Sequence, residues 1–588
     1  MPQRLPVLVF ALIMAAIPFV PGMPPFWIVL LDNIGLAALV AMGLVLLTGV
    51  GGLTSFGQAA FCGFGAYTTA ILTTSYGFSP WLSLPVALAV TGAAAVLLGL
   101  ITVRLSGHYL PLGTLAWGIS LYFLFGKIDM LGRHDGITGV PPLTIGPWSL
   151  IDPKATYWVI WAAVLLAGIG TTNLLSSRVG RAIRALRRGG VAAESFGVDR
   201  MRVKLVVFVY AALLAGLSGW LYAHLQRSVN PTPFGLNAGI EYLLMATLGG
   251  AGYVWGALLG AGVVTILKDA LQRILPAMLG SDVQAETIVF GMVLVATLQV
   301  ARTGLWPRLA ALFPAPSPVA PQADAKSLAR RSAGADVSPL LEIEGLSKRF
   351  GGIVAVNDVT VAVPPHAIVG LIGPNGAGKS TLFNLITSIL KPSSGRVRFA
   401  GEAIDGRSPA EVARRGVART FQHVKLMPDM SVIENVALGA HLRGRSGVAA
   451  SILHLERAEE GRLLAEAARQ IARVGLAEQI DRPAGSLPLG QQRIVEIARA
   501  LCLDPRLLLL DEPAAGLREF EKRMLAELLC QLRAEGMTML LVEHDMGFVM
   551  GLVDRIVVLD FGSKIAEGTP AEIKTDPAVL AAYLGAEA

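Results

Sequence analysis

A glycine-rich loop near the middle of the chain has the spacing of a phosphate-binding motif. It reads Gly373, Pro374, Asn375, Gly376, Ala377, Gly378, Lys379, Ser380 and Thr381. The apolar run 367–372 before it predicts a buried strand, and 382–390 after it predicts a helix. Backbone N–H groups of such a loop surround phosphate oxygens at a positively polarised helix N-terminus. The lysine of this motif reaches the β- and γ-phosphates and its serine ligates Mg²⁺, so we expect a nucleotide site using Lys379 and Ser380.

Two acidic residues at the end of a leucine run are a second chemical signal. Leu507 to Leu510 form a continuous apolar stretch, and Asp511 and Glu512 follow it directly. This pattern is typical of a fully buried parallel strand that delivers side chains at its carboxyl end. We expect Asp511 to hold Mg²⁺ and Glu512 to be the base that orients or deprotonates an attacking water. Their place downstream of a phosphate-binding loop favours this interpretation over a solvated turn.

The composition indicates a membrane part joined to a soluble part. The chain has 588 residues, of which 53% are apolar and 15% charged, whereas ordinary soluble domains are about 25% charged. We assign the net charge of +7 to cytoplasmic loops facing anionic lipid. Because no basic stripe is interleaved with aromatic residues, no nucleic-acid partner is expected. The three cysteines have no ligand spacing and predict neither a disulfide framework nor a zinc site.

The first half of the chain contains many apolar stretches. Leu5 to Val20 resembles a signal peptide, but another apolar stretch follows it, so we interpret it as an uncleaved span. The further candidate spans are 27–48, 57–75, 81–103, 109–126, 156–172, 205–223, 240–267 and 286–301. Glycine clusters at 48–52 and 248–252 interrupt two of these regions. Broken helices often line a substrate path, although ordinary close packing explains any single glycine equally well.

The loop 178–204 sets the expected orientation. Its basic residues are Arg178, Arg181, Arg184, Arg187, Arg188, Arg200, Arg202 and Lys204, against Glu194 and Asp199. The positive-inside rule places it in the cytoplasm, and the spacing of Arg181, Arg184 and Arg188 predicts an amphipathic helix that docks an ATPase or faces lipid. Three apolar stretches follow before 301, yet a return to the cytoplasm needs an even number. Either 240–267 is split at its glycines or one stretch is re-entrant.

Three stretches of the first half have a recognisable pattern. They are 48–67 (Thr-Gly-Val-Gly-Gly-Leu-Thr-Ser-Phe-Gly-Gln onward), 179–197, and 241–252 (Glu-Tyr-Leu-Leu-Met-Ala-Thr-Leu-Gly-Gly-Ala-Gly) followed by Gly256 to Gly260. Together they resemble the LivM-type permeases of branched-chain amino acid ABC importers. The second is similar to the family's cytoplasmic coupling segment. This resemblance covers about 30–305 and implies a polytopic, all-α transmembrane domain, which we place at 1–310.

The second half predicts an α/β domain behind a connector. Residues 311–339 are rich in Pro, Ala and Ser without an apolar period, which predicts a flexible linker. From Leu340 to the end, strands and helices alternate, so 340–588 is expected to be an α/β P-loop domain. The chain as a whole is therefore expected to be a multi-domain protein.

The second half also resembles the ABC ATPases, and among them the LivG-like subunits. The resemblance implies that Phe350 stacks on adenine, that Gln422 senses Mg²⁺ and contacts the permease, and that His544 is the switch histidine at the γ-phosphate. It further implies that 513–517 couples the two ATPase subunits, and the tail 566–585 is also similar to the Liv type. For each side chain, a structural role in the core or on the surface is the alternative.

The signature motif departs from the family pattern. The family usually has Leu-Ser-Gly-Gly-Gln, and this chain has Leu487, Pro488, Leu489, Gly490 and Gln491. The missing serine hydroxyl is the group that contacts the γ-phosphate held by the partner ATPase, and proline offers neither hydroxyl nor N–H. Gly490 and Gln491 remain, so we infer that docking is retained and that the composite site using this signature is weakened.

Together these patterns predict a fused permease and ATPase of an ATP-driven importer in the bacterial inner membrane, with its ATPase domain in the cytoplasm. ATP and Mg²⁺ are the expected cofactors. The resemblance implies LivH-like and LivF-like partner subunits and an extracytoplasmic binding protein, with a homodimer as the alternative. Branched-chain amino acids are the expected solutes. A urea or short-amide importer, an ABC exporter half-transporter and a non-pumping nucleotide-gated regulator are the alternatives.

Overall fold

The computed structural model describes residues 4–105, 107–279, 291–292, 295–296, 299, 304–311, 325, 327–331 and 339–584. By their internal contacts the residues form two compact units. The first comprises Met1–Ser176, Met201–Pro318 and Val448–His454, and the second comprises Ser177–Arg200, Val319–Gly447 and Leu455–Ala588. The basic loop 178–200 therefore groups with the second half of the sequence, and residues 448–454 of that half group with the first half.

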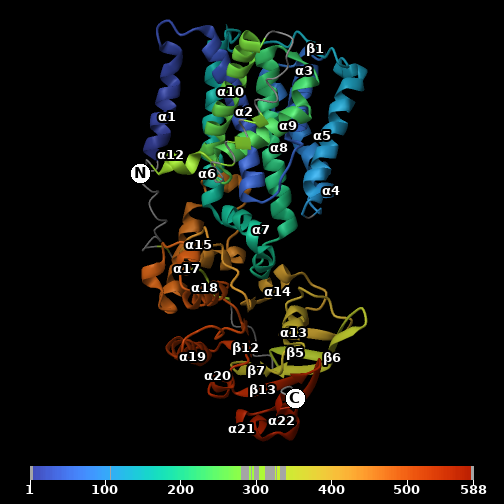
Figure 1. The fold of residues 1–588 in the computed structure, drawn as a ribbon, viewed down its shortest axis with the longest axis vertical. Helices are drawn as coiled ribbons and strands as arrows, with labels where there is room; N and C mark the ends of the chain where they lie inside the picture. Colours follow the sequence, from blue (N-terminus) through green and yellow to red (C-terminus); the bar gives the residue numbers. More distant parts are fainter. Residues whose placement is uncertain are drawn as a thin grey trace. The chain divides into compact units, whose positions relative to one another are not determined.

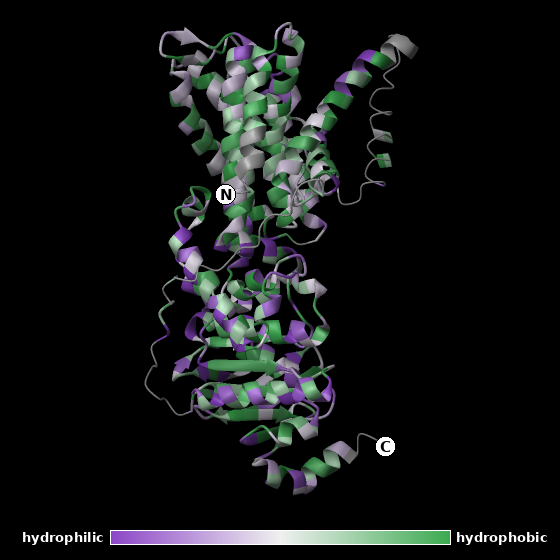
Figure 2. Cartoon of the chain, turned by 90° about the vertical axis from the view of Figure 1, so that its left-hand side faces the viewer, coloured by the Kyte–Doolittle hydropathy of each residue, from purple (hydrophilic) through white to green (hydrophobic). Residues whose placement is uncertain are grey.

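The first unit is a bundle of apolar helices (Figure 1). They are α1 (Arg4–Ala16), α2 (Pro25–Leu44), the π-helix η2 (Val45–Val50), α3 (Gln58–Thr74), α4 (Pro80–Thr102), α5 (Tyr109–Lys127), α6 (Pro153–Ser176), α8 (Arg200–Gln226), η4 (Thr232–Phe234), α9 (Leu236–Gly250), α10 (Val254–Leu279), α12 (Trp306–Ala310) and α16 (Val448–Ile452). Short strands β1 (Ile137–Thr138) and β4 (Ser228–Val229) pair, as do β2 (Thr144–Ile145) and β3 (Trp148–Ser149). Figure 2 shows how strongly hydrophobic residues dominate the bundle.

Six helices of the described residues are long and apolar enough to cross a membrane: Pro25–Val50, Pro80–Thr102, Tyr109–Lys127, Pro153–Ser176, Arg200–Gln226 and Val254–Ile274. The stretch predicted at 240–267 is split into α9 and α10, which is the first of the two alternatives that the sequence left open. The predicted spans 5–20 and 57–75 contain the shorter helices α1 and α3. The predicted span 286–301 lies largely outside the described residues.

The two glycine-rich interruptions lie against each other. After η2 the chain is irregular until α3, and the second break separates α9 from α10. A Cβ atom built on Gly49 would lie 2.6 Å from the backbone nitrogen of Gly252 and 3.0 Å from the carbonyl carbon of Ala251. Because real Cβ atoms do not approach backbone that closely, only glycine at 49 permits this contact between two broken helices.

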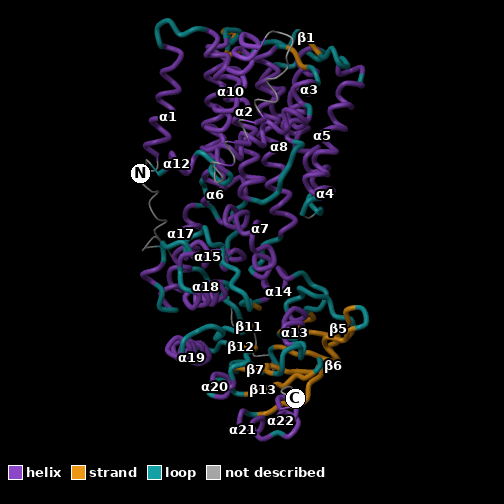
Figure 3. Tube along the Cα trace, viewed as in Figure 1, coloured by secondary structure: helices purple, strands orange, loops and turns teal. Residues whose placement is uncertain are grey.

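The second unit contains two sheets, whose strands are orange in Figure 3. The first has the order β10 (Val417–Arg419), β11 (Leu507–Asp511), β12 (Thr538–Val542), β7 (Ile368–Ile372), β13 (Arg555–Asp560) and β14 (Ser563–Gly568). The second has the order β6 (Ile353–Val363), β5 (Leu341–Phe350), β8 (Ser394–Phe399) and β9 (Glu402–Ala403). Strands β7, β11 and β12 are parallel neighbours buried at every position, as the uninterrupted apolar runs predict.

Helices surround these sheets. They are α7 (Arg178–Ser195), α13 (Lys379–Ile386), α14 (Pro409–Arg415), α15 (Val432–Gly439), α17 (Arg457–Arg473), α18 (Leu489–Cys502), α19 (Glu519–Ala534), α20 (Met546–Met550), α21 (Pro570–Thr575) and α22 (Pro577–Leu584). The predicted amphipathic helix is α7, with non-helical backbone angles at Gly189. Leucine and valine side chains of α15, α17, α18 and α19 belong to one hydrophobic cluster that also contains buried residues of the larger sheet.

Part of the segment predicted as a flexible linker lies against the second unit. Leu328 packs on the apolar core, and Arg443 donates to the carbonyl oxygen of Ala329 at 3.0 Å. The Arg331 side chain donates to the carbonyl oxygens of Asp504 and Arg414. These contacts fix 327–331, while most of 311–339 lies outside the described residues. The domain limits given by the sequence therefore stay predictions.

Candidate functional site

The glycine-rich loop joins buried strand β7 to helix α13, as its sequence context predicts. Gly378 has φ +95°, and a Cβ there would lie 2.4 Å from the carbonyl oxygen of Ala355. A side chain at 378 would therefore force the loop away from β6. Asn375, Gly376 and Ser380 are exposed, whereas Ala377 and Lys379 are buried. The loop thus presents its backbone and the Ser380 hydroxyl outward.

Lys379 folds back onto its own loop. Its Nζ donates to the carbonyl oxygens of Gly373 at 2.7 Å and Pro374 at 2.9 Å. Burial lowers the pKa of Lys379, and the carboxylates of Glu512 and Asp511 counteract that shift. A phosphate in the loop would give this ammonium a charged acceptor, and charge-assisted hydrogen bonds are roughly twice as strong as neutral ones.

Asp511 ends β11 and forms an ion pair with Arg419 at the end of neighbouring β10. Arg419 Nη2 lies 2.8 Å from Asp511 Oδ2, and Arg419 Nη1 donates to Asn384 Oδ1 at 2.6 Å. Burial raises the pKa of the Asp511 carboxyl, and Arg419 counteracts that shift. The other oxygen, Asp511 Oδ1, is buried and has no hydrogen-bond partner. An unpartnered carboxylate oxygen fits a hard cation such as Mg²⁺.

Glu512 brings the predicted catalytic side chains together. Gln422 Nε2 donates to Glu512 Oε1 at 3.1 Å, and His544 Nδ1 lies 3.9 Å from Glu512 Oε2. Glu512 has φ +48°, a conformation that is uncommon for a residue with a side chain. Two hydrogen bonds hold it: its N–H donates to Val542 O at 2.9 Å, and its carbonyl accepts from Arg493 Nη1 at 2.7 Å. These two hydrogen bonds fix the backbone of Glu512 and thereby the direction of its carboxylate.

Glu543 fixes the backbone on either side of this group. Its buried carboxylate accepts from the N–H of Ala514 at 2.7 Å and from the N–H of His544 at 3.1 Å. Burial raises the pKa of Glu543, and these two hydrogen bonds counteract that shift. The carboxylate thereby joins the 513–517 loop to the strand end that carries His544.

The remaining predicted site residues are Phe350, at the end of strand β5, and Gly490 and Gln491, near the start of helix α18. Phe350 ends β5, where it pairs with Ile353, and its ring is 45% exposed, so it is not a core phenylalanine. Gly490 and Gln491 lie in the first turn of α18, which Leu489 begins, and Pro488 precedes the helix without a side-chain capping hydrogen bond. Arg493, which holds the Glu512 carbonyl, comes from the next turn of the same helix. The helix that carries Gly490 and Gln491 therefore also contacts the backbone of Glu512.

Three residues that position the site were not assigned by sequence reasoning: Arg419, Arg493 and Glu543. Each lies within three residues of a motif residue in the chain, but this position does not show which side chain or backbone group it will contact. Arg419 reaches Asp511 because β10 and β11 are parallel with Arg419 opposite Leu509. The alignment of β10 with β11 depends on the tertiary fold and cannot be taken from the sequence. The only sequence feature that pointed to Arg419 was a charge at the end of a short strand.

We expect Arg419→Met to destabilise the chain by about 3–5 kcal/mol, because it leaves Asp511 buried without its partner. Both side chains are nearly inaccessible, 5% and 2% exposed, so solvent screening is small. Calorimetric unfolding of the full-length protein measures the loss. Arg415→Met is the matched control: its partner Glu402 is 69% exposed, and this pair is worth about 0–1 kcal/mol. Equal losses for the two variants would contradict the prediction.

Helix α7 is held in the second unit by its basic residues. Arg181 forms a two-pronged ion pair with Glu460 of α17, and Arg184 Nη2 lies 2.7 Å from Glu434 Oε1 of α15. Arg178 donates to the carbonyl oxygens of His441 and Ser446, each at 2.7 Å. Burial together with Arg178 and Arg181 lowers the pKa of His441 to about 3, so this imidazole is neutral. These contacts favour protein docking over a lipid-facing charge run.

Comparisons with known proteins match both halves of the chain. Residues 28–298 match the model of the branched-chain amino acid transport system permease component, 356–515 that of the ABC transporter, and 563–588 that of the branched-chain amino acid ATP-binding cassette transporter. The chain is 45% identical over 250 residues to the high-affinity branched-chain amino acid transport ATP-binding protein LivG of Escherichia coli (strain K12), covering 42% of this chain and 98% of that protein.

Two further relatives match the same half. The high-affinity branched-chain amino acid transport ATP-binding protein BraF of Pseudomonas aeruginosa is 44% identical, over 42% of this chain and 98% of its own length. The probable LivG of Methanocaldococcus jannaschii is 34% identical, over 42% of this chain and 99% of its own length. A crystal structure of an ATP-binding cassette in its ADP conformation is 34% identical, covers 42% of this chain and 98% of that one, and has a TM-score of 0.38.

Proposed function

Because the chain belongs to the branched-chain amino acid ABC transporter family, with an ABC ATPase domain behind its permease domain, we propose that it imports branched-chain amino acids in a bacterial inner membrane. The observation that carries the proposal is the convergence of Lys379, Asp511 and Glu512 in the same compact unit as the basic helix α7. We infer that hydrolysis at that site moves α7 together with the unit that contains it.

Hydrolysis is a problem of positioning and electrostatics that this chain's residues can perform. The loop 373–381 binds the phosphates and Phe350 stacks on the adenine. Glu512 accepts a proton from the attacking water, Gln422 holds that carboxylate in place, and His544 faces the γ-phosphate. Mg²⁺ would be held by Ser380, Gln422 and the unpartnered Oδ1 of Asp511, and would neutralise charge on the phosphates.

Among the described residues, no group of three or more His, Cys, Asp or Glu could hold a metal ion. Hydroxyl, amide and phosphate oxygens would therefore supply most ligands of Mg²⁺, which is its usual coordination in ATPases. The proposed Mg²⁺ site is accordingly complete only with nucleotide present.

A complete transporter of this family type needs partners. The chain offers one permease and one ATPase, so we infer a LivH-like permease, a LivF-like ATPase and an extracytoplasmic binding protein, with the ATPase domain in the cytoplasm. Pro488 gives the partner's nucleotide no hydroxyl or N–H. The site formed by this chain's Lys379 and Glu512 would consequently take its signature from the partner and be the stronger of the two.

Uptake into proteoliposomes tests the proposal. The chain is reconstituted alone and with its genomic-neighbour permease, ATPase and binding protein, and ATP-dependent uptake of labelled leucine, isoleucine, valine and urea is measured. We expect leucine uptake only with the complete set. Urea uptake without leucine uptake would contradict the proposed amino acid substrate. Uptake by the chain alone would replace the heteromer with a homodimer. The permease match and the importer-type relatives do not favour an exporter or a non-pumping regulator.

A further inference from the structure

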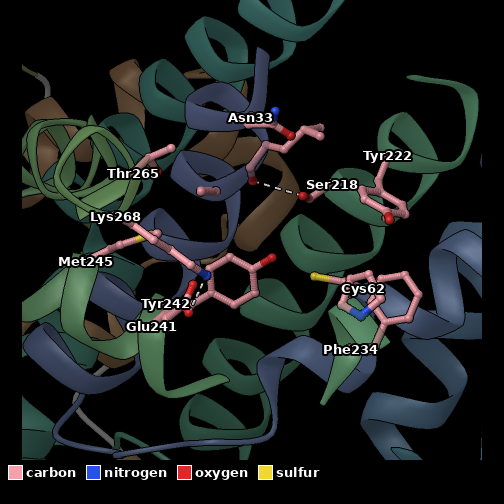
Figure 4. Close-up of a pocket in the computed structure, with 14 residues that line it drawn as sticks. Asn33, Cys62, Ser218, Tyr222, Phe234, Glu241, Tyr242, Met245, Thr265 and Lys268 are labelled. Carbon is pink, nitrogen blue, oxygen red and sulfur yellow. Dashed lines mark hydrogen bonds and ion pairs between the residues drawn. The ribbon is translucent and has the colours of Figure 1, made fainter. Parts of the chain in front are cut away.

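A pocket of about 240 Å³ lies in the first unit, between α2, α3, α8, α9 and α10 (Figure 4). Pockets for drug-sized ligands measure roughly 300–1,000 Å³, so this volume suits a smaller solute. Leu36, Ala37 and Met245 supply apolar wall, and Phe234 and Tyr222 supply aromatic wall. The pocket therefore combines apolar and aromatic wall with polar side chains, among them Asn33, Ser218 and Thr265.

Two opposite charges line this pocket. Lys268 Nζ of α10 lies 2.6 Å from Glu241 Oε1 of α9, and their side chains remain 44% and 26% exposed. Figure 4 draws the pair at one side of the pocket, with Tyr222 and Phe234 at the other side. Lys268 belongs to a helix long and apolar enough to span a membrane. Ionisable residues in such helices face a partner, a bundle interior or a water-filled cavity, and mark solute pathways.

The pocket lies toward one end of the bundle. Ser218 and Tyr222 line it and lie in the last third of α8 (Arg200–Gln226). At 1.5 Å per residue, Ser218 is roughly 27 Å along the helix from Arg200. The basic loop before Arg200 is expected to be cytoplasmic. The pocket is therefore placed in the half of the bundle remote from the cytoplasm, where a solute released by an extracytoplasmic binding protein enters.

We propose that this pocket binds the transported amino acid as its zwitterion. The Glu241 carboxylate faces the substrate ammonium, the Lys268 ammonium faces the substrate carboxylate, and the aliphatic side chain lies against Leu36, Ala37 and Met245. An ion pair that opens to admit a zwitterion exchanges one pair of charge contacts for two, so no buried charge is left alone. A neutral amide such as urea has no charges to match this pair. The inference rests on the proposed amino acid import and names its site in the membrane.

Binding to the assembled membrane complex in lipid nanodiscs, without the binding protein, tests the site. Saturation-transfer NMR titrations compare leucine, isoamylamine (no carboxylate) and 4-methylpentanoate (no ammonium). We expect Lys268→Met to weaken leucine binding about tenfold or more, while isoamylamine, which no longer has to displace Lys268, binds at least as tightly as to the parent. Glu241→Gln should weaken leucine binding equally, while 4-methylpentanoate binds at least as tightly as to the parent. Arg273→Gln is the control on the same helix, because Arg273 contacts Asp269 and the ring of Phe26 and none of the three residues lines the pocket.

A double variant separates substrate binding from a structural role. If the pair only stabilises the fold, Glu241→Gln with Lys268→Met removes both charges and should recover leucine binding relative to either single variant. The proposal expects the double variant to stay as weak as the weaker single variant. Unchanged leucine affinity in both single variants would overturn it while wild-type uptake upholds the import function. Absence of leucine uptake in the wild type would overturn the import function itself.

Discussion

Glu512→Gln should lower ATP hydrolysis by about two to four orders of magnitude and leave ATP binding nearly unchanged. The amide cannot accept a proton from the attacking water, yet it has almost the shape of the carboxylate. Gln422 can still donate to the Oε1 atom at this position, and the Arg493 contact to the backbone carbonyl is unaffected. Phosphate release by the reconstituted complex measures the rate, and equilibrium binding of labelled ATP measures retention of the site.

Glu519→Gln provides the control for this variant. Glu519 lies on α19 of the same unit, its side chain is 82% exposed, and its only described ion pair is with Lys522. The same Glu-to-Gln change there should leave hydrolysis unaltered. If Glu512→Gln hydrolyses ATP at the parental rate, Glu512 is not the base, and another group must activate the water.

Local motifs made the parts of the candidate nucleotide site recognisable in the sequence. The loop 373–381 and the pair Asp511-Glu512 each carry their chemistry in consecutive residues, and the apolar runs beside them identify their strands. The family resemblance named Gln422 and His544 as site residues, and the structure places both beside Glu512. What could not be predicted was the support: Arg419 depends on the register of β10 against β11, and Arg493 on where α18 crosses the strand end.

The sequence predicted that the first half consists of apolar membrane helices, but not where these helices break or which residues meet between them. Hydropathy identifies apolar stretches, but it cannot show that 240–267 breaks into α9 and α10. The break lies against Gly49, two hundred residues earlier in the chain, and hydropathy carries no information on that contact. Lys268 and Glu241 are likewise brought together by the packing of two helices. Neither residue has a motif around it that indicates a charge partner.

Arg181→Glu should reduce ATP-driven uptake at least about a hundredfold while the ATPase remains active. The Arg181 side chain is 2% exposed and Glu460 is 14% exposed, so the ion pair is largely shielded from water. Removing one partner of such a pair costs about 3–5 kcal/mol, and a like charge in its place adds repulsion. In the proposed mechanism α7 transmits movement of the ATPase, so a helix that no longer docks leaves hydrolysis without transport. Uptake and phosphate release measured on the same vesicles report the ratio.

A variant with the charges of Arg181 and Glu460 exchanged tests whether the lost ion pair causes the loss of uptake. Arg181→Glu combined with Glu460→Arg recreates opposite charges between the same two helices and should recover most of the uptake. Arg462→Glu is the matched control, because Arg462 is exposed on α17 and hydrogen-bonds within its own helix, to Ala458. If the charge-reversed pair remains inactive although each protein assembles, the Arg181 contact acts through its shape rather than its charge. If Arg181→Glu alone transports normally, α7 does not couple the ATPase to the permease through this residue.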